Sequence, residues 1–388
     1  MYWRLMTLGA ALALVAGSVA GQTQGVSKTE IVVGSLQDLS GPIASLGKAS
    51  RNGMQMRIDE QNEKGGVHGR KIRFLVEDHA YDPKRAVLAT HKLLEQDKIF
   101  LMLGHIGTPT NVAVMPLLFE RNVINLFPFS PARQMFDPVH RLKFASFTPY
   151  HDQVRQSVPV LVRQKGLKKP CIIYQDDDYG IEHLKGAEEG LKTINLQWIE
   201  KTSYKRGATD FSSQVARMKS AGCDLVVLGT LVRETIGTVS EARKTGFSPV
   251  FLGTTGLYYD QIHKLGGPAM EGIIATHTAA VPYPDSGSEA VRAWIQRYKS
   301  KFGEDPWMHS VYGYANAEAM ITALEKAGPD LTTDSLISAI EATRFPTDIF
   351  GSAEMTFSPT KRLGSSLYRF AEIRNGRWVT TSDYFGER

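Results

Sequence analysis

Two short stretches of the chain place a hydroxyl side chain next to a proline where a strand-like run ends. Residues 104–111, GHIGTPTN, follow the apolar run 99–103, and a Phe-Ser-Pro sequence at 129–131 follows the next such run. Thr108 and Ser130 each precede a proline, which fits an N-cap residue with proline at the first helical position. Two such helix starts side by side would bind a carboxylate through free N–H groups and positive dipole ends. The alternative is that both hydroxyls only cap their helices, and the pattern alone favours neither interpretation.

Other patterns that could support chemistry are incomplete. Residues 41–50, GPIASLGKAS, nearly match a phosphate-binding loop, but five residues separate the glycines and Ala49 stands where a hydroxyl would hold magnesium. The acidic run 176–178 lacks the alternate spacing of a calcium loop and predicts a solvated loop at a strand end. The ten histidines show no metal-binding spacing, and His105 is expected to make a structural hydrogen bond. Since no nucleophile motif is present either, we expect no enzyme, no cofactor and no metal.

The first twenty residues have the features of a secretory signal peptide. Arg4 precedes the apolar run 5–16, which is followed by a small-x-small sequence at 18–20. This segment is too short, and flanked in the wrong way, to be a membrane span. No cysteine lies near the cleavage site, and no later apolar run is long enough to cross a bilayer. We therefore expect residues 1–20 to be removed and the mature protein to be periplasmic and soluble, without a membrane anchor.

Composition indicates a globular protein of two ordinary domains. The chain has 388 residues, of which 42% are hydrophobic and 22% charged. Its formal charge of +5 falls to +4 when Arg4 is removed, and the basic residues form no long block. A mildly basic, solvated surface explains this distribution, so we expect no nucleic-acid partner.

The chain contains two cysteines, Cys171 and Cys223. Each begins an apolar, strand-like run, which favours two buried thiols. An oxidising export compartment would also permit a disulfide between them.

Strand-like runs alternate with helical patterns along most of the chain. We expect strands at 30–36, 71–76, 99–103, 123–127, 171–175, 197–204, 224–229 and 250–253, and helices at 45–64, 82–97, 109–121, 180–194, 209–221 and 232–245. In the second helix Leu88, Leu93 and Leu94 should face the core. This alternation predicts two similar lobes, each a parallel sheet with helices on both faces. Helices at 288–302, 309–327 and 333–342 should cover a lobe already begun, and 353–357 should pair with 366–373 as an edge hairpin.

Five stretches of this chain, in order, resemble a known family. They are LSGPIASLGKASRNGMQMRIDEQNEKGGVHGRKI, DPKRAVLATHKLL, GHIGTPT, DDDYG and TDFSSQVARMKSAGCDLVVLG. Together they resemble the leucine/isoleucine/valine-binding proteins, the extracytoplasmic receptors of branched-chain amino acid ABC transporters. The likeness covers nearly the whole mature chain.

The resemblance implies an α/β fold of two Rossmann-like lobes, the type I periplasmic binding fold, with three crossing hinge segments. We place the crossings near 147–150, 276–279 and 351–358. The N-terminal lobe would contain residues 28–148 plus 278–352. The C-terminal lobe would contain residues 149–277 plus 353–388. Ligand would be captured in the cleft between the lobes.

The resemblance also implies site residues. The loop that holds the ligand's carboxylate in that family falls on Gly107 and Thr108, and its companion loop on Phe129, Ser130 and Pro131. The strand-end tyrosine of the second lobe falls on Tyr179.

Three positions depart from the amino-acid-binding pattern. Thr255 stands at the position where the amino-acid binders have an acidic residue facing the ligand's ammonium group. Leu46 and Leu231 stand at two positions where those proteins have aromatic residues. A buried ammonium group without a carboxylate partner is unfavourable by several kcal/mol. With Phe127 and Phe129, the leucines indicate an apolar or aromatic ligand body, and Arg133 either adds charge to the carboxylate site or lies on the surface.

We therefore expect a monomeric periplasmic receptor that binds a small apolar or aromatic carboxylate and delivers it to ABC transporter permease subunits. A branched-chain amino acid receptor, or a sensor of the same fold that responds to amides, is the alternative.

Overall fold

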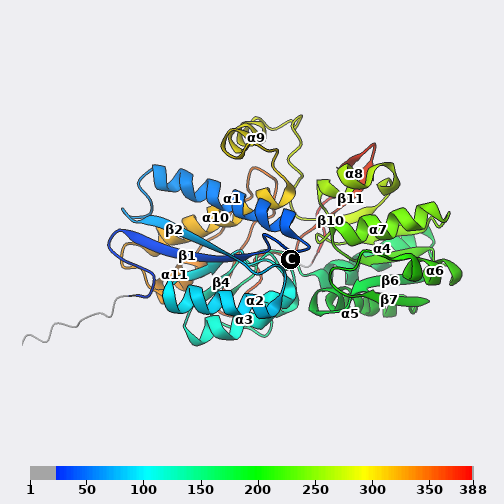
Figure 1. Cartoon of the computed structure of the whole chain (residues 1–388), viewed down its shortest axis with the longest axis horizontal. Coiled ribbons are helices and arrows are strands. Elements are labelled where there is room, and N and C mark those ends of the chain that lie inside the picture. Colours follow the sequence, from blue (N-terminus) through cyan, green and yellow to red (C-terminus); the bar gives the residue numbers. More distant parts are fainter. Residues whose placement is uncertain (1–22, 387–388) are drawn as a thin grey trace, which may run out of the picture.

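Two α/β lobes lie side by side in the computed structural model, which describes residues 23–386 (Figure 1). The predicted signal peptide, residues 1–20, lies outside the described residues. The predicted fold class, two lobes built on parallel sheets, is confirmed.

Five parallel strands form the sheet of the first lobe. Their spatial order is β2 (Lys71–Asp78), β1 (Glu30–Gln37), β3 (Leu101–Leu103), β4 (Ile124–Leu126) and β5 (Lys143–Phe144). Strands β3 and β4 are buried along their whole length, as is typical of apolar runs inside parallel sheets.

Helices cover both faces of this first sheet. One face carries α1 (Ala44–Glu63) and α10 (Met308–Ala327), and the other carries α2 (Pro83–His91) and α3 (Thr108–Glu120) (Figure 1). The short π-helical turn Lys92–Gln96 continues α2. Two more helices, α9 (Glu289–Phe302) and α11 (Thr333–Glu341), complete the lobe. Helix α2 begins as its sequence predicts, since the Asp82 carboxylate accepts the N–H of Arg85 and Pro83 follows the cap.

The second lobe has a seven-stranded sheet. In spatial order it contains β12 (Arg377–Thr380), β11 (Arg369–Arg374), β10 (Ile274–His277), β9 (Val250–Gly253), β8 (Leu225–Gly229), β6 (Pro170–Gln175) and β7 (Glu200–Tyr204). Strands β6 to β10 are parallel, and β11 and β12 form an antiparallel edge. Its helices are α4 (Tyr150–Lys165), α5 (Asp178–Lys192), α6 (Ser212–Ser220), α7 (Val232–Lys244) and α8 (Asp260–Gly266).

Three details of the predicted elements are wrong. Leu88 is 70% exposed, whereas Leu93 and Leu94 are buried as expected, because the π-helical turn changes the direction of the helix face after His91. The edge hairpin pairs β11 with β12 instead of with 353–357, where only Met355 forms an isolated bridge, to Phe345. The predicted elements lack helices α4 and α8 and strands β5, β10 and β12.

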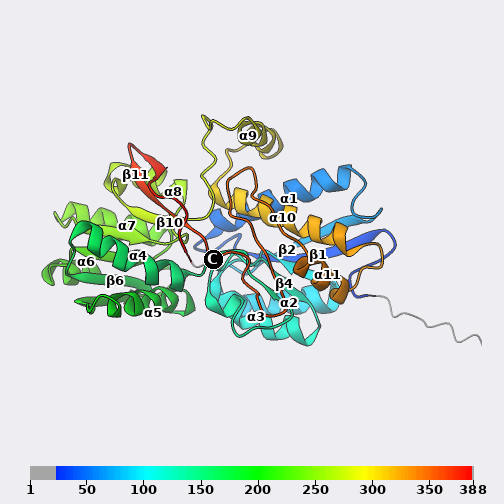
Figure 2. The ribbon, with the colours of Figure 1, turned by 180° about the vertical axis from the view of Figure 1, so that it is seen from behind.

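The chain crosses between the lobes three times, near the centre of the molecule (Figure 2). It passes from β5 to α4 through residues 145–149 and from β10 to α9 through residues 278–288. Leu363 bridges Ala145, and Gly364 donates its N–H to the Ala145 carbonyl at 2.8 Å, so the chain up to 364 stays with the first lobe. The third crossing therefore lies at residues 365–368, after the predicted crossing at 351–358. The predicted start of the C-terminal lobe's last segment, at residue 353, comes before a stretch that packs on the first lobe.

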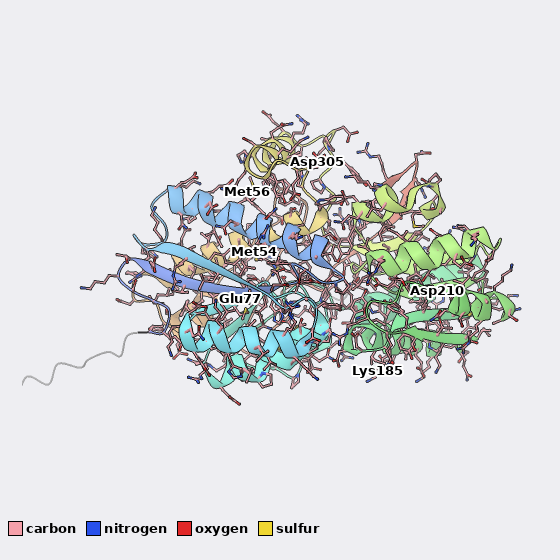
Figure 3. The ribbon with its side chains drawn as sticks, viewed as in Figure 1. Met54, Met56, Glu77, Lys185, Asp210 and Asp305 are labelled. Atoms are coloured by element: carbon pink, nitrogen blue, oxygen red, sulfur yellow. A yellow bond between two sulfur atoms is a disulfide. The ribbon has the colours of Figure 1, made fainter. Side chains whose placement is uncertain are left out.

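A close approach between helices fixes the core of the first lobe. Gly53 of α1 and Gly313 of α10 face each other's helix: a Cβ on Gly53 would lie 2.1 Å from the Ser310 carbonyl oxygen. Met54, next to it, is fully buried (Figure 3). The two helices can therefore pack this closely only because these positions carry no side chain.

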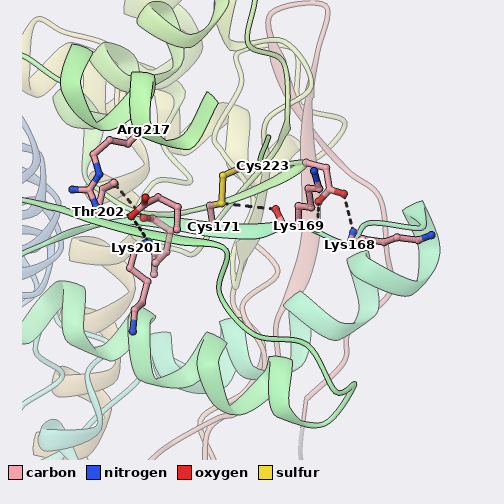
Figure 4. The surroundings of a disulfide bond; sticks show 10 residues. Lys168, Lys169, Cys171, Lys201, Thr202, Arg217 and Cys223 are labelled. Atoms are coloured by element: carbon pink, nitrogen blue, oxygen red, sulfur yellow. Dashed lines mark hydrogen bonds and ion pairs between the residues drawn. A yellow bond between two sulfur atoms is a disulfide. The ribbon is translucent and has the colours of Figure 1, made fainter. Parts of the chain in front are cut away.

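Cys171 and Cys223 form a disulfide (Figure 4), which corrects the expectation of two buried thiols. The reason is strand order: β6 and β8 are neighbours in the sheet although β7 lies between them in sequence. The Asp224 carboxylate accepts the N–H groups of Lys168 and Lys169, each at 2.8 Å, and so holds the starts of the two strands together.

Charged side chains cover the outside of both lobes, as Lys185, Asp210 and Asp305 illustrate (Figure 3). Within residues 23–386, no helix combines the length and apolar character that a bilayer crossing needs. The same residues bring together no group of three or more His, Cys, Asp or Glu side chains able to hold a metal ion.

Candidate functional site

Two small cavities lie where the lobes face each other. The cleft cavity, of about 20 Å³, is lined from the first lobe by Ile43, Leu46, Tyr81, Ile106, Gly107, Thr108, Phe129 and His309, and from the second by Tyr150, Tyr179, Leu231 and Tyr259. The bridging cavity, also about 20 Å³, is lined by Phe129, Pro131, Phe147, Tyr150, Thr255, Tyr259, His309 and Tyr312. The two cavities adjoin, since four residues line both: Phe129, Tyr150, Tyr259 and His309. Most of the lining side chains are buried, so the two lobes are closed around this space.

The start of α3 forms one wall of the cleft cavity. The helix begins at Thr108 with Gly107 as N-cap, one residue earlier than predicted, because the φ of Gly107 is 98° and glycine adopts such values readily. A Cβ on Gly107 would lie 2.6 Å from the Tyr81 ring. The first N–H groups of an α-helix have no partner within the helix. Since Pro109 has no N–H and the Gly107 N–H donates to the Phe129 carbonyl, this wall offers the N–H groups of Thr108 and Thr110 together with the Thr108 hydroxyl.

Ser130 supports this wall from behind and does not line either cavity. Its hydroxyl lies 2.8 Å from the Thr108 hydroxyl, in a hydrogen bond between the two. The prediction that Ser130 caps a helix is wrong: Pro131 and Ala132 continue in extended form. The cause is that the preceding residue, Phe129, bonds to the GHIG loop, with its N–H donating to the His105 carbonyl at 3.0 Å.

Arg133 does not reach the candidate site. It begins a single 3₁₀ turn, and its N–H donates to the Glu182 carboxylate at 3.0 Å. Its guanidinium lies 3.5 Å from His151 of α4. The charge that Arg133 could add to a carboxylate is therefore directed toward α4 and α5 of the second lobe.

The second lobe supplies an aromatic and apolar wall. Tyr179, at the start of α5, donates its hydroxyl to the Thr230 carbonyl at 2.9 Å, which fixes the ring beside Leu231. Thr255 lies at the bridging cavity, but Gln153 bonds both its N–H and its hydroxyl. The Gln153 amide oxygen accepts the Thr255 N–H at 2.9 Å and the amide nitrogen donates to the Thr255 hydroxyl at 3.1 Å.

Two other residues differ from their predicted roles. Phe127 is fully buried in the first-lobe core, against Phe345 and Phe357, and lines neither cavity. Within residues 23–386, neither ring nitrogen of His105 has a hydrogen-bond partner, and burial holds the pKa of His105 well below 6.5. His105 is therefore a neutral, packed ring, not the hydrogen-bonding residue expected.

The sequence interpretation missed several aromatic residues of the site: Tyr81, Tyr150, Tyr259 and His309. Tyr259 lies within the GTTGLYY stretch that supplied Thr255, four residues further on, and Tyr150 follows the first crossing directly. His309 comes from α10, far from the other motifs, and no local pattern marks it.

His309 links the two lobes through neutral hydrogen bonds. The Ser50 hydroxyl donates to the Leu46 carbonyl at 2.9 Å, so it accepts from His309 Nδ1 at 2.7 Å. His309 Nε2 is then left to accept the Tyr259 hydroxyl at 3.0 Å. Burial lowers the pKa of His309 to about 3, which keeps the ring neutral. The site therefore gains no positive charge from this residue.

Further hydrogen bonds hold the lobes together at the edges of the cleft. Gln175 donates to the Tyr81 hydroxyl at 3.2 Å, and Arg206 donates to the Tyr81 carbonyl at 2.9 Å. At another edge of the cleft, the Arg133 N–H donates to the Glu182 carboxylate. These contacts exist only while the lobes face each other.

No acidic side chain of residues 23–386 lines the cleft cavity or the bridging cavity. Glu234, one turn beyond Leu231, is buried, and burial raises its pKa. Asp260 is also buried, and one of its oxygens accepts from Lys264 at 2.8 Å. The lining therefore favours a ligand with an acceptor group and an apolar body over one with a buried ammonium group.

Known proteins share this architecture. A family model described as "Periplasmic binding protein" matches residues 30–377. The Leu/Ile/Val-binding protein homolog 7 of Brucella melitensis is 27% identical over 336 residues, which cover 81% of this chain and 82% of that protein.

Three solved structures have similar folds. A fatty acid ABC transporter substrate-binding protein from Thermomonospora curvata has a TM-score of 0.85 at 24% identity, covering 95% of each chain. A branched-chain amino acid ABC transporter protein from Thermus thermophilus with bound valine has a TM-score of 0.83 at 19% sequence identity, covering 92% of this chain and 97% of that one. A solute-binding protein from R. palustris in complex with benzoate has a TM-score of 0.80 at 17% sequence identity, covering 92% of this chain and 98% of that one.

At these identities the solved structures establish the fold, and the family model spans most of the sequence. Two lobes with parallel sheets, three crossings and a closed cleft between them agree with that match. The chain therefore belongs to the periplasmic binding protein family.

Proposed function

We propose that this protein is a periplasmic solute receptor, not an enzyme, that captures a small carboxylic acid with an apolar or aromatic body and delivers it to an ABC importer. The observation that carries the ligand class is the cleft cavity itself. It combines the Thr108 hydroxyl and the first N–H groups of α3 with an aromatic and leucine wall, and no acidic side chain of the described residues faces it.

The proposed binding mode follows from these groups. A carboxylate would lie against the start of α3, where N–H groups and the positive dipole end favour an anion. Leu46, Phe129 and Leu231 would cover the ligand's body and remove apolar surface from water, at roughly 25 cal/mol per Å². The ligands named for similar structures, benzoate and fatty acids, are of this class.

A branched-chain amino acid receptor is the second candidate. The name of the Brucella relative and the valine bound to the Thermus protein favour it. Against it, Thr255 carries no charge and its hydroxyl accepts from Gln153, so no carboxylate at that position neutralises an ammonium group.

Export to the periplasm and the monomeric state remain predictions from the sequence and the resemblance. The family match supports export, and neither prediction depends on which ligand is bound.

A thermal-shift screen tests the ligand class. Aromatic acids, fatty acids, branched-chain amino acids and amides would be added to the purified mature protein. A ligand at a hundred times its Kd stabilises the folded state by about 2.7 kcal/mol, which raises the melting temperature measurably. We expect acids to raise it, and amino acids and amides to leave it unchanged.

Substitutions at Thr108 test the binding mode by calorimetry. Thr108→Val keeps the shape of the side chain and removes its hydroxyl, so the affinity for an acid should fall about 5- to 100-fold. Thr108→Ser keeps the hydroxyl and should bind nearly as the wild type does. Equal affinities for all three proteins would mean that Thr108 only begins a helix.

A further inference from the structure

A third cavity, larger than the other two, lies in the first lobe behind the three crossings. This hinge cavity has a volume of about 510 Å³. Each crossing contributes to its lining, with Thr148 from the first, Thr278 from the second and Leu367 from the third. The proposed function does not use this space.

The hinge cavity adjoins the bridging cavity. Phe147 and Tyr312 line both, and their rings meet edge to face with centroids 4.9 Å apart. The bridging cavity in turn shares Phe129 and Tyr150 with the cleft cavity. The three cavities therefore form a series that starts at Thr108, in which each cavity shares lining residues with the next.

Helix α10 forms one wall of the hinge cavity. Tyr312, Ala315, Ala319 and Thr322 line it, and their spacing places them on one face of the helix. At 1.5 Å per residue, Tyr312 and Thr322 are about 15 Å apart along the axis. Two of the four are alanines, which leave room beside the helix for a narrow chain.

The charged side chains around the hinge cavity already have partners. Arg297 pairs with Glu60 at 3.4 Å, and Glu318 pairs with Arg57. The Asp348 carboxylate accepts the N–H of Phe350 at 2.9 Å. The remaining lining is mainly aromatic and aliphatic, so the cavity suits an uncharged apolar group and offers no free partner to a charged head.

We propose that the ligand is a carboxylic acid with an extended apolar chain, whose head lies at Thr108 and whose tail passes Phe147 and Tyr312 into the hinge cavity. This proposal rests on the carboxylate site of the proposed function and extends it to a substrate class, medium-chain and long-chain acyl carboxylates. Phe147 is half-buried and belongs to the first crossing, so rotation of the lobes carries its ring and can open the way to the tail.

Calorimetry with acids of increasing length tests the proposal. From a head at Thr108, butyrate and benzoate are too short to reach the hinge cavity, octanoate should enter it, and dodecanoate should extend along α10. Each buried methylene tightens binding by up to about fourfold, so octanoate should bind at least about tenfold more tightly than butyrate.

Two substitutions on α10 should shorten the accepted chain to different lengths. Ala315→Leu, nearer the cleft, should weaken octanoate and dodecanoate by about tenfold or more and leave butyrate and benzoate within about twofold. Thr322→Leu, two turns further on, should weaken dodecanoate alone. Ala89→Leu is the control: it is a half-buried alanine on α2 of the same lobe, away from all three cavities, and should change no affinity. Circular dichroism would confirm that each variant is folded, and either α10 variant alone suffices for the test.

The results separate this inference from the proposed function. If butyrate or benzoate binds but octanoate and dodecanoate bind no more tightly, or if Ala315→Leu weakens all acids equally, the tail does not occupy the hinge cavity. If no acid of any length binds, the proposed carboxylate site does not exist, and the inference that rests on it is also wrong.

Discussion

Four buried histidines make the stability of the protein depend on pH. Burial lowers the pKa of His309 to about 3, and the pKa values of His79, His183 and His277 to about 4, from the usual 6.5. Below pH 6.5 the unfolded chain binds protons that the folded chain does not. The free energy of unfolding should therefore fall as the pH drops from 6.5 to 4, by up to about 1.4 kcal/mol per pH unit for each histidine.

Urea unfolding at pH 7.5, 5.5 and 4.5 measures this dependence. Burial raises the pKa values of Glu182 and Glu234, which contribute with the opposite sign at acidic pH. A comparison with His183→Gln removes their effect, because only the histidine differs. The variant should lose stability less steeply between pH 6.5 and 4.5, and identical slopes would show that His183 is not held neutral by the fold.

At the residue scale, one local pattern has two different structural outcomes. Thr108 follows from its place after an apolar run, and the structure puts it at the cleft. Ser130 has the same local pattern, yet it lies behind Thr108, because the pairing of Phe129 with the GHIG loop keeps the chain extended. His309 could not be predicted, since its role depends on contacts with Ser50 and Tyr259, which are distant in sequence.

At the scale of elements, the contact between α1 and α10 depends on glycine. A methyl group on Gly53 would lie 2.1 Å from the Ser310 carbonyl, so Gly53→Ala must push the helices apart. Overpacking of this kind costs about 1–3 kcal/mol. Urea unfolding should show that loss, whereas Gly287→Ala, where no atom lies within 4 Å of the new Cβ, should have almost no effect. Equal stability of Gly53→Ala and the wild type would mean that the helices can separate without loss.

Most elements could be predicted from the sequence because apolar periodicity and turn residues are local. Strand β9 was predicted at its observed bounds, and the other predicted strands of both sheets differ from the structure by a few residues. Helix α4 was missed, and its interior Pro159 does not explain why, since α3 was predicted with Pro116 inside it. Strand order is not local, and for that reason the Cys171–Cys223 disulfide became visible only in the structure. The β11–β12 hairpin is local, since Asn375-Gly376 joins its strands, and the prediction overlooked this turn signal.

For the whole molecule, the cross-lobe hydrogen bonds imply a closed state that must open to admit a ligand. Residues 145–149, 278–288 and 365–368 would absorb the rotation. Small-angle scattering should give a smaller radius of gyration with a bound acid than without it. Tyr259→Phe removes the bond to His309 and should favour the open state of the free protein. An unchanged radius with saturating ligand would indicate a site that forms without closure.

The central claim is that the cleft recognises a carboxylate and has no partner for an ammonium group. Calorimetry with matched pairs tests it most directly: phenylpropionate against phenylalanine, and isocaproate against leucine, since each pair differs only in the α-amino group. A buried, unpaired ammonium group costs several kcal/mol, so each acid should bind at least about a hundredfold more tightly than its amino acid. Tighter binding of leucine or phenylalanine than of the matching acid would contradict the account.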